Sequence, residues 1–106
     1  MKKMFDTQVS KDYRYVIKKG VPEMPTVSSF YGITISMYYK DHEPPHIHAE
    51  YAGMVEVIDI RDGSVREGKI PKRAHKMVIE WWDIHRHELM DMWVNNQRGK
   101  KLPPLD

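Results

Sequence analysis

One long segment without helix breakers limits most strongly what this chain can fold into. Between Pro71 and Gln97 the sequence contains no further proline or glycine, and Gly99 follows as a stop. At about 100° per residue, the apolar side chains of this interval fall on one broad side of a helix. They are Ala74, Met77, Val78, Trp81, Trp82, Ile84, Leu89, Met92 and Trp93. The sequence therefore predicts one long amphipathic helix from Pro71 to about Asn96, which must bury this side.

The surface that this helix would cover is predicted by residues 33–69, where apolar and polar side chains alternate as in half-buried strands. The pairs Ala52-Gly53 and Asp62-Gly63 suit tight hairpin turns, the second of type I′. Connections this short cannot join parallel strands. We therefore expect an α+β fold, an antiparallel β-meander of about four strands packed against one long C-terminal helix. The expected inward-facing residues are Ile33, Ile35, Ile47, Ile58 and Ile60.

The domain organisation is predicted from length, prolines and charge. The 106 residues suffice for one domain with one modest core. Pro22 and Pro25 interrupt the chain, so we expect a basic N-terminal extension at residues 1–23, the α+β domain at 24–99 and a departing tail at 100–106. The positive charge of the extension is compatible with binding to RNA, DNA or an acidic partner, although solvated basic termini are common. An uncovered strand edge would favour a homo-oligomer or a partner complex.

The composition also predicts the cellular compartment of the protein. The chain has no cysteine, which excludes disulfides and thiolate metal sites and suits a reducing environment. No apolar run reaches the roughly 18 residues of a membrane-spanning helix, and the first residues lack the apolar run of a signal peptide. We therefore expect a cytoplasmic protein that does not enter a membrane.

Histidines concentrate in one short segment, where His42, His46 and His48 surround the Pro44-Pro45 pair. Strand alternation places His46 and His48 on one face, with Cβ atoms about 7 Å apart. Such imidazoles can share a divalent metal ion if a further ligand joins them. They can instead transfer protons without a metal, as in cleavage of RNA by its own 2′-hydroxyl, because imidazoles titrate near neutral pH. In a third, structural interpretation, the rings donate hydrogen bonds to backbone carbonyls near the prolines.

Two titratable residues are expected near the buried side of the helix, His85 close to its centre and Glu88 one turn further on. They can form a satisfied polar pair, or one of them can reach the histidine segment and orient it. Trp81, Trp82 and Trp93 are expected in the core rather than on a base-stacking surface, although Trp82 and Trp93 lie at the rim of the apolar side.

A basic run surrounds the predicted start of the helix. Its members are Lys69, Lys72, Arg73 and Lys76. The positive end of the helix dipole would help them to contact the phosphates of a nucleic acid. The commoner interpretation of such a run is a solvated face.

Four motifs of the chain are distinctive when taken together. They are Met-Pro-Thr-Val-Ser-Ser-Phe-Tyr-Gly-Ile at residues 24–33, Asp-His-x-Pro-Pro-His-x-His-Ala-x-Tyr at 41–51, Gly-x-Ile-Pro-x-Arg at 68–73 and Trp-x-x-x-His-x-x-Glu-Leu at 81–89. This set resembles the DUF4160 family of small prokaryotic proteins of unknown function. The resemblance implies a gene often found beside one for a small DUF2442-type protein, in an arrangement similar to toxin–antitoxin pairs. The recurring polar residues of the family match Asp41, His42, His46, His48, Arg73, His85 and Glu88.

These features lead to one hypothesis and two alternatives. The hypothesis is a toxin–antitoxin-like module component that binds or cleaves RNA, with a DUF2442-like protein as its partner. The first alternative is a non-catalytic binding or regulatory module, either antitoxin-like or transcription-associated, in which the histidines are structural. The second alternative is a metal-dependent hydrolase. No cofactor is assigned, and a divalent metal at the three histidines stays open. The candidate catalytic residues are His42, His46, His48, His85 and Glu88.

Overall fold

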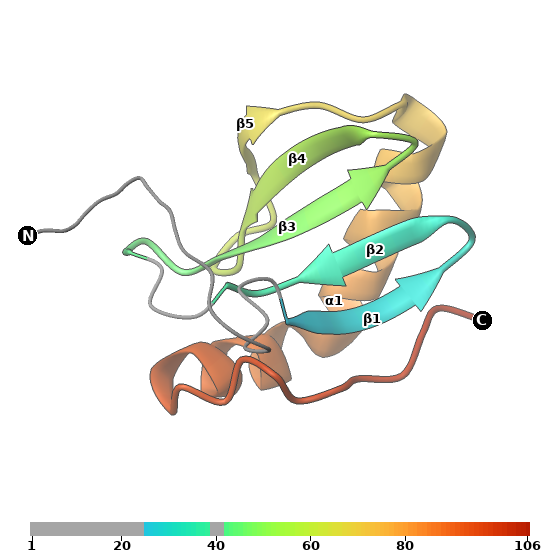
Figure 1. Ribbon diagram of the computed structural model, residues 1–106. Helices are drawn as coiled ribbons and strands as arrows, with labels where there is room; N and C mark the ends of the chain where they lie inside the picture. Colours follow the sequence, from blue (N-terminus) through green and yellow to red (C-terminus); the bar gives the residue numbers. More distant parts are fainter. Residues whose placement is uncertain (1–24, 39–41) are drawn as a thin grey trace, which may run out of the picture.

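The computed structural model describes residues 25–38 and 42–106, which form one sheet and one helix (Figure 1). The predictions for the basic extension at residues 1–23 and for Asp41 lie outside the described residues. The predicted α+β fold is confirmed, except that the sheet has five strands rather than four. The elements are β1 (Thr26–Phe30), β2 (Ile33–Ser36), β3 (His46–Tyr51), β4 (Met54–Asp59), β5 (Val65–Gly68) and α1 (Lys72–Val94).

The sheet is an antiparallel meander in the order β1-β2-β3-β4-β5. Two of its connections are two-residue turns with positive φ at both positions. These φ angles are 49° and 80° at Tyr31 and Gly32, and 51° and 82° at Ala52 and Gly53. Positive φ at both central residues characterises the type I′ turn, whose twist matches that of the strands. The predicted tight turn at Ala52-Gly53 is therefore confirmed.

The strand missing from the prediction is β1, because its side chains do not alternate. Its large apolar residues, Val27 and Phe30, are both buried although they lie an odd number of positions apart. The pairing of β1 with β2 is irregular between Thr26 and Ser28. An extra residue at such a bulge shifts the following side chains to the opposite face. The irregularity hides the period of two on which the prediction rested.

The connection between β4 and β5 is wider than the predicted type I′ turn. Gly63 has a φ of 77°, but Asp62 does not share the positive φ that this turn requires. The backbone N–H of Asp59 donates instead to the carbonyl of Ser64, at 2.9 Å. Asp62 accepts a hydrogen bond from the N–H of Ser64 at 3.0 Å, and Asp59 accepts one from the N–H of Arg61 at 2.9 Å. Carboxylates that bind nearby backbone groups stabilise this loop in place of the tighter turn.

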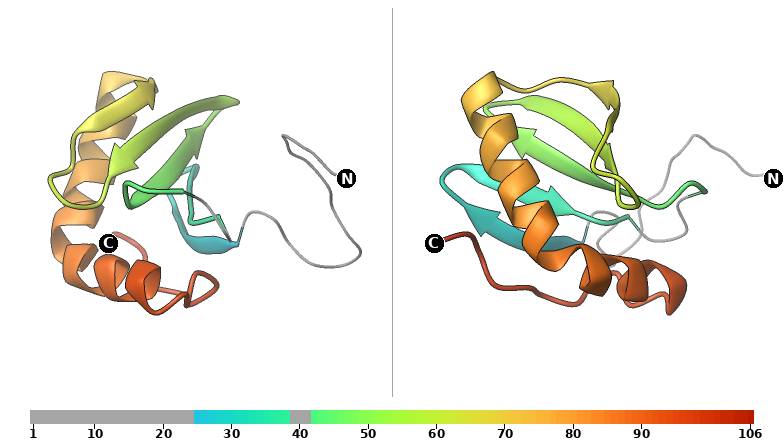
Figure 2. Two further views of the ribbon diagram at one scale, coloured as in Figure 1. Left: turned by 90° about the vertical axis from the view of Figure 1, so that its left-hand side faces the viewer. Right: turned by 180° about the vertical axis from the view of Figure 1, so that it is seen from behind.

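The core lies between α1 and one face of the sheet, which α1 crosses diagonally (Figure 2). The five isoleucines predicted to face inward are all at most 1% exposed: Ile33, Ile35, Ile47, Ile58 and Ile60. Trp82 and Trp93 are 6% and 4% exposed and so belong to the core, as predicted. Ile84, in contrast, is 63% exposed, because it lies at the edge of the apolar side.

Helix α1 begins at Lys72, one residue after the predicted start at Pro71, and ends at Val94, close to the predicted end at about Asn96. Asn96 has a positive φ of 56°. Within the described ranges, no helix has both the length and the apolar character that crossing a bilayer demands.

The C-terminal residues pack back onto the sheet instead of departing from it. The N–H of Leu102 donates to the carbonyl of Val27 at 2.9 Å, and the indole N–H of Trp81 donates to the carbonyl of Pro103 at 2.8 Å. Leu102 is buried, and the segment runs beside β1 in Figures 1 and 2. This segment covers the outer edge of β1, which weakens the expectation that a partner must cover it.

Candidate functional site

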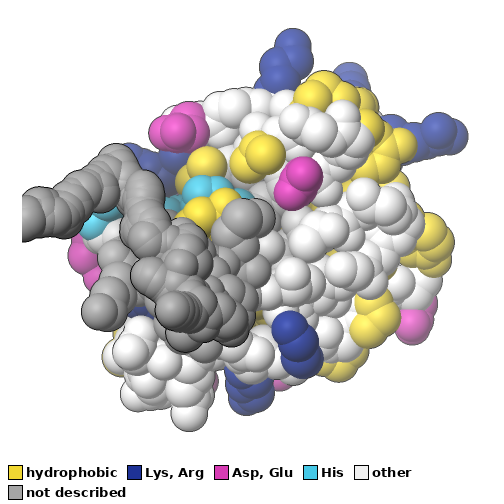
Figure 3. Space-filling model, in the orientation of Figure 1, with side chains coloured by type: hydrophobic (Ala, Val, Ile, Leu, Met, Phe, Trp, Pro, Cys, Tyr) yellow, Lys and Arg dark blue, Asp and Glu magenta, His cyan; other side chains and the backbone are white. Residues whose placement is uncertain are grey.

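The predicted histidine cluster lies on the face of the sheet that α1 leaves uncovered. His48 pairs with Val57, and His46 pairs with Asp59. Residues directly opposite one another in antiparallel strands project to the same face. Ile47, between the two histidines, projects to the other face and is fully buried. Figure 3 looks onto the uncovered face and shows histidine side chains reaching its surface.

His42, His46 and His48 line one pocket of about 410 Å³. The ring centroids of His42 and His46 lie 6.1 Å apart, and those of His46 and His48 lie 5.2 Å apart. The structure thus brings together the three histidines that the sequence singled out. The other lining residues are Glu43, Pro44, Val57, Arg66 and Glu67.

Backbone carbonyls fix two of these rings. The Nδ1–H group of His46 donates to the carbonyl of Pro44 at 2.7 Å, and that of His42 donates to the carbonyl of Glu43 at 3.2 Å. Because a carbonyl only accepts, Nδ1 carries the hydrogen, and in the neutral ring the lone pair lies on Nε2. The bonds fit the structural interpretation of the histidines. Hydrogen bonds from Nδ1 to a backbone carbonyl also orient imidazoles that act in catalysis or bind metals.

His48 is held by an aromatic neighbour. Its ring stacks on Tyr38, with ring centroids 4.2 Å apart and an interplanar angle of 21°. The carbonyl of Tyr38 accepts a hydrogen bond of 3.1 Å from Arg98, which follows α1. The segment after the helix therefore helps to position this side of the pocket.

Trp93 is the helix residue that reaches the histidine segment. Its ring centroid lies 5.2 Å from that of His46, and its indole N–H donates to the carboxylate of Glu43 at 2.8 Å. The guanidinium of Arg98 lies over Trp93, 3.9 Å from the ring centroid. The sequence placed Trp93 at the rim of the apolar side but gave no sign of its contact with Glu43, fifty positions away.

His85 and Glu88 pair with each other rather than with the pocket. His85 Nδ1 lies 2.7 Å from Glu88 Oε1, and the ring of His85 lies against Trp81 at 4.9 Å between centroids. Neither residue is among the described residues that line the pocket. Of the two interpretations of their spacing, this geometry fits the polar pair whose members satisfy each other, and not the one in which a helix residue orients the histidine segment.

Arg66, a residue without a predicted role, also lines the pocket. Asp59 is 1% exposed and accepts hydrogen bonds from Arg61 Nε at 3.0 Å, Arg61 Nη2 at 2.7 Å and Arg66 Nη1 at 3.2 Å. The Arg61 guanidinium, helped by Arg66 and opposed by burial, lowers the pKa of Asp59 from 3.8 to about 2. Asp59 therefore stays ionised and ties Arg66 to the wall of the pocket.

The predicted basic run lies elsewhere. Lys69, Lys72, Arg73 and Lys76 are all exposed around the start of α1. That start lies at the opposite end of the sheet from the histidine segment, as Figures 1 and 2 show. The structure thus does not join this run and the histidines into one surface.

A metal centre has no complete ligand set among residues 25–38 and 42–106. No group of three or more His, Asp or Glu residues there is arranged to hold one ion. The two His rings that donate from Nδ1 would each offer only Nε2 as a ligand. A metal site would therefore need a further ligand.

The fold and the pocket define a small α+β domain, in which one helix covers a five-stranded meander and the other face carries a polar pocket. The model of the family described as a domain of unknown function (DUF4160) matches residues 32–94, more than half of the chain. The chain therefore belongs to the DUF4160 family, as its motifs predicted. Comparisons with curated proteins and with solved structures gave no match.

Proposed function

We propose that the histidine-lined pocket binds and cleaves RNA by metal-free acid–base catalysis. The observation that carries the proposal is the arrangement of His42, His46 and His48 at centroid separations of 6.1 and 5.2 Å, with Arg66 in the same pocket. Imidazoles that line one pocket can reach the attacking and the leaving oxygen of one phosphodiester group. A nearby guanidinium can bind the anionic oxygens.

The reaction needs one proton acceptor and one proton donor. A neutral imidazole takes the proton of the ribose 2′-hydroxyl, whose oxygen attacks the adjacent phosphorus. The bond from phosphorus to the 5′-oxygen breaks, and a protonated imidazole gives that oxygen its proton. The products are a 2′,3′-cyclic phosphate and a free 5′-hydroxyl, and no metal ion or cofactor is consumed. Histidine suits both roles because its two protonation states coexist near neutral pH.

The hydrogen bonds of the pocket support this use of the rings. Donation from Nδ1 of His46 to Pro44 holds the ring and places the neutral lone pair on Nε2. The guanidinium of Arg66 is held in place by Asp59, so substrate binding does not have to order this side chain.

The proposal includes a cellular setting that follows from the family resemblance. The protein would act in the cytoplasm as one component of a toxin–antitoxin-like module. A small DUF2442-like protein would bind it and control access to RNA. Co-expression with that partner should suppress RNA cleavage in cells if this setting is correct.

A second candidate function is a non-catalytic binding module. The observation that favours it is that His42 and His46 both donate to backbone carbonyls of their own loop, as structural histidines do. In this case the pocket would bind RNA or a protein without turnover. The metal-dependent hydrolase gains no support from the described residues, which form no ligand set of three.

Substitutions that separate proton transfer from scaffolding test the proposal. Asparagine at position 46 can keep a hydrogen bond from its amide to Pro44 but cannot titrate. His46→Asn and His48→Ala should each slow cleavage of single-stranded RNA in chelator by about 100-fold or more, the usual contribution of an acid or base. Both should remain folded at the assay temperature, which their melting curves check. His87→Ala, on the exposed side of α1, is the matched control and should change neither property.

Two outcomes would contradict the catalytic proposal. One is wild-type protein that leaves RNA intact in chelator under all conditions of pH. The other is a loss of about 1–3 kcal/mol of unfolding free energy in both variants with activity unchanged, the expected result if the histidines only satisfy buried hydrogen bonds.

A further inference from the structure

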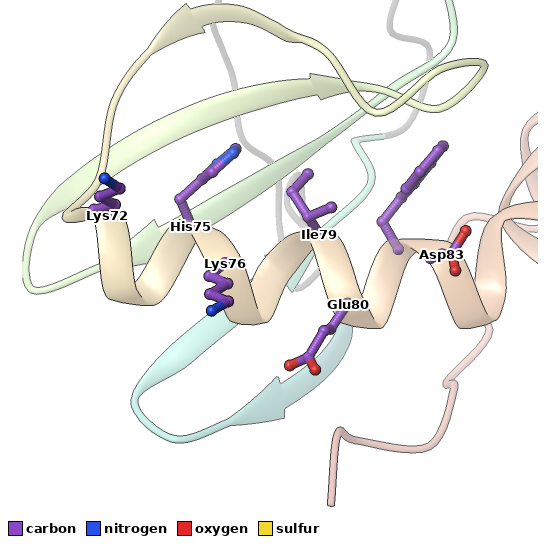
Figure 4. Close-up of a pocket in the computed structure, with 7 residues that line it drawn as sticks. Lys72, His75, Lys76, Ile79, Glu80 and Asp83 are labelled. Carbon is purple, nitrogen blue, oxygen red and sulfur yellow. The ribbon is translucent and has the colours of Figure 1, made fainter.

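A second groove lies on the other side of the molecule, along the flank of α1 that faces the β4–β5 hairpin. Its volume is about 490 Å³, within the range of small-ligand sites. Four of its lining residues, Lys72, His75, Ile79 and Trp82, recur at helical spacing along one flank. Figure 4 shows Lys72, His75 and Ile79 pointing to the same side of the helix. The groove therefore runs from a polar end to an apolar end.

The polar end contains a buried carboxylate. Glu56 of β4 is 2% exposed, and both of its oxygens lie within hydrogen-bond distance of His75 Nδ1, at 2.8 and 3.0 Å. His75 is itself 34% exposed at its side chain and lines the groove. The carboxylate of Glu56 accepts the Nδ1–H of His75 and fixes the ring, so Nε2 can donate to a second anion only in the protonated ring, where both nitrogens carry a hydrogen. Lys72, one turn before His75, adds a flexible positive charge at this end.

The apolar end is rigid. The indole N–H of Trp82 donates to the carbonyl of Ile60 at 2.9 Å, and the ring lies against Gly63, where a Cβ atom would come within 2.8 Å of it. The guanidinium of Arg86 lies 5.3 Å from the centre of the ring. Ile79 supplies the remaining apolar wall. A flat apolar group can pack here without first ordering the side chains that receive it.

The charges of the groove fix the orientation of a ligand. Lys72 and Lys76 lie toward the polar end, whereas Glu80 and Asp83 flank the apolar end. A negative group would be attracted to the first pair and repelled by the second. Figure 4 shows Lys76 and Glu80 on the opposite side of the helix from His75, so Lys72 is the nearer cation.

We propose that this groove is a second ligand site, which takes a small organic carboxylate with a flat apolar body. The ligand carboxylate accepts from the ammonium group of Lys72 and from the Nε2–H of His75 in its protonated form, and the apolar body packs on Ile79 and Trp82. This site uses none of the residues of the histidine-lined pocket and does not depend on RNA cleavage.

Binding of phenylacetate to the full chain, followed by amide and indole N–H signals in NMR spectra, tests the proposal. Phenylacetamide has the same shape without the charge and is the matched ligand. We expect saturable shifts at residues 72–83 and at the Trp82 indole with phenylacetate. Phenylacetamide and the Lys72→Met variant should each bind about tenfold more weakly, because a charge-assisted contact is lost. Lys100→Met, an exposed lysine outside the groove, should leave affinity unchanged.

Several results would overturn the proposal. Equal affinity for the acid and the amide would show that the groove does not select an anion. Shifts confined to the histidine-lined pocket would place the ligand at the other site. Signals at residues 72–83 that change on dilution of the protein alone, with no response to phenylacetate, would show that this flank contacts a second copy of the chain instead.

Discussion

The two faces of β3 and β4 are stabilised by different forces. Under α1, Ile47 and Ile58 are fully buried among apolar side chains. On the other face, His46 and Asp59 are 7% and 1% exposed, and their partners are a backbone carbonyl and two guanidinium groups. Apolar packing is non-directional, whereas hydrogen bonds and ion pairs require particular atoms. The comparison indicates that one face supplies most of the stability, while the other holds polar groups in positions suited to chemistry.

The largest expected effect is on the covered face. Ile47→Ala removes a fully buried side chain and should lower the free energy of unfolding by about 2–5 kcal/mol. Val55→Ala, on the uncovered face and 41% exposed, is the matched control and should cost less than about 1 kcal/mol. Denaturant unfolding of both variants measures the difference. Similar losses would show that the two faces contribute equally, contrary to the comparison.

A smaller effect is expected from the buried carboxylate of the uncovered face. The pKa of Asp59 is 3.8 unfolded and about 2 folded, so its stabilisation is complete above pH 3.8 and disappears as the pH falls through 2. Asp59→Asn should therefore cost about 2 kcal/mol at pH 7 and nearly nothing at pH 2.

Unfolding free energies between pH 2 and pH 7 check this prediction, with Glu50→Gln, at an exposed position, as the control. If the loss of unfolding free energy in the variant stayed constant down to pH 2, Asp59 would stabilise the fold through packing rather than through its charge.

The smallest effect concerns two glycines with similar backbones. Gly53 and Gly63 have φ angles of 82° and 77°, so alanine is strained at both. A Cβ atom meets nothing within 4 Å at position 53 but comes within 2.8 Å of the Trp82 ring at position 63. Gly63→Ala should therefore lose about 1 kcal/mol more unfolding free energy than Gly53→Ala. Equal losses would mean that Trp82 moves freely, and would also remove the rigid apolar end of the second groove.

Much of the fold could be predicted from the sequence because its signals are local. Helix α1 and strands β2 to β4 follow from periodicity, and the isoleucines face inward as their alternation requires. Strand β5 follows from the hairpin expected at Asp62-Gly63. Strand β1 was missed because its bulge breaks the alternation. The type I′ turn expected after β4 does not form, and Asp59 and Asp62 instead accept hydrogen bonds from backbone N–H groups of the wider loop.

The candidate site was predictable only in part. Strand alternation put His46 and His48 on one face, and the structure adds His42 to the same pocket. Periodicity reports the face on which a side chain lies but not its distant partner. For that reason the sequence did not reveal the bond from Trp93 to Glu43 or the place of Arg66 beside Asp59.

The most direct test of the central claim compares RNA with an oligonucleotide of the same sequence made of 2′-deoxy nucleotides. Both are incubated with the full chain in chelator, and the products are separated by mass. The account predicts that RNA alone is cut, that its fragments end in 2′,3′-cyclic phosphate, and that the rate falls at both low and high pH, because one imidazole must be neutral and another protonated. Intact RNA, or equal cleavage of the deoxy oligonucleotide, would contradict it.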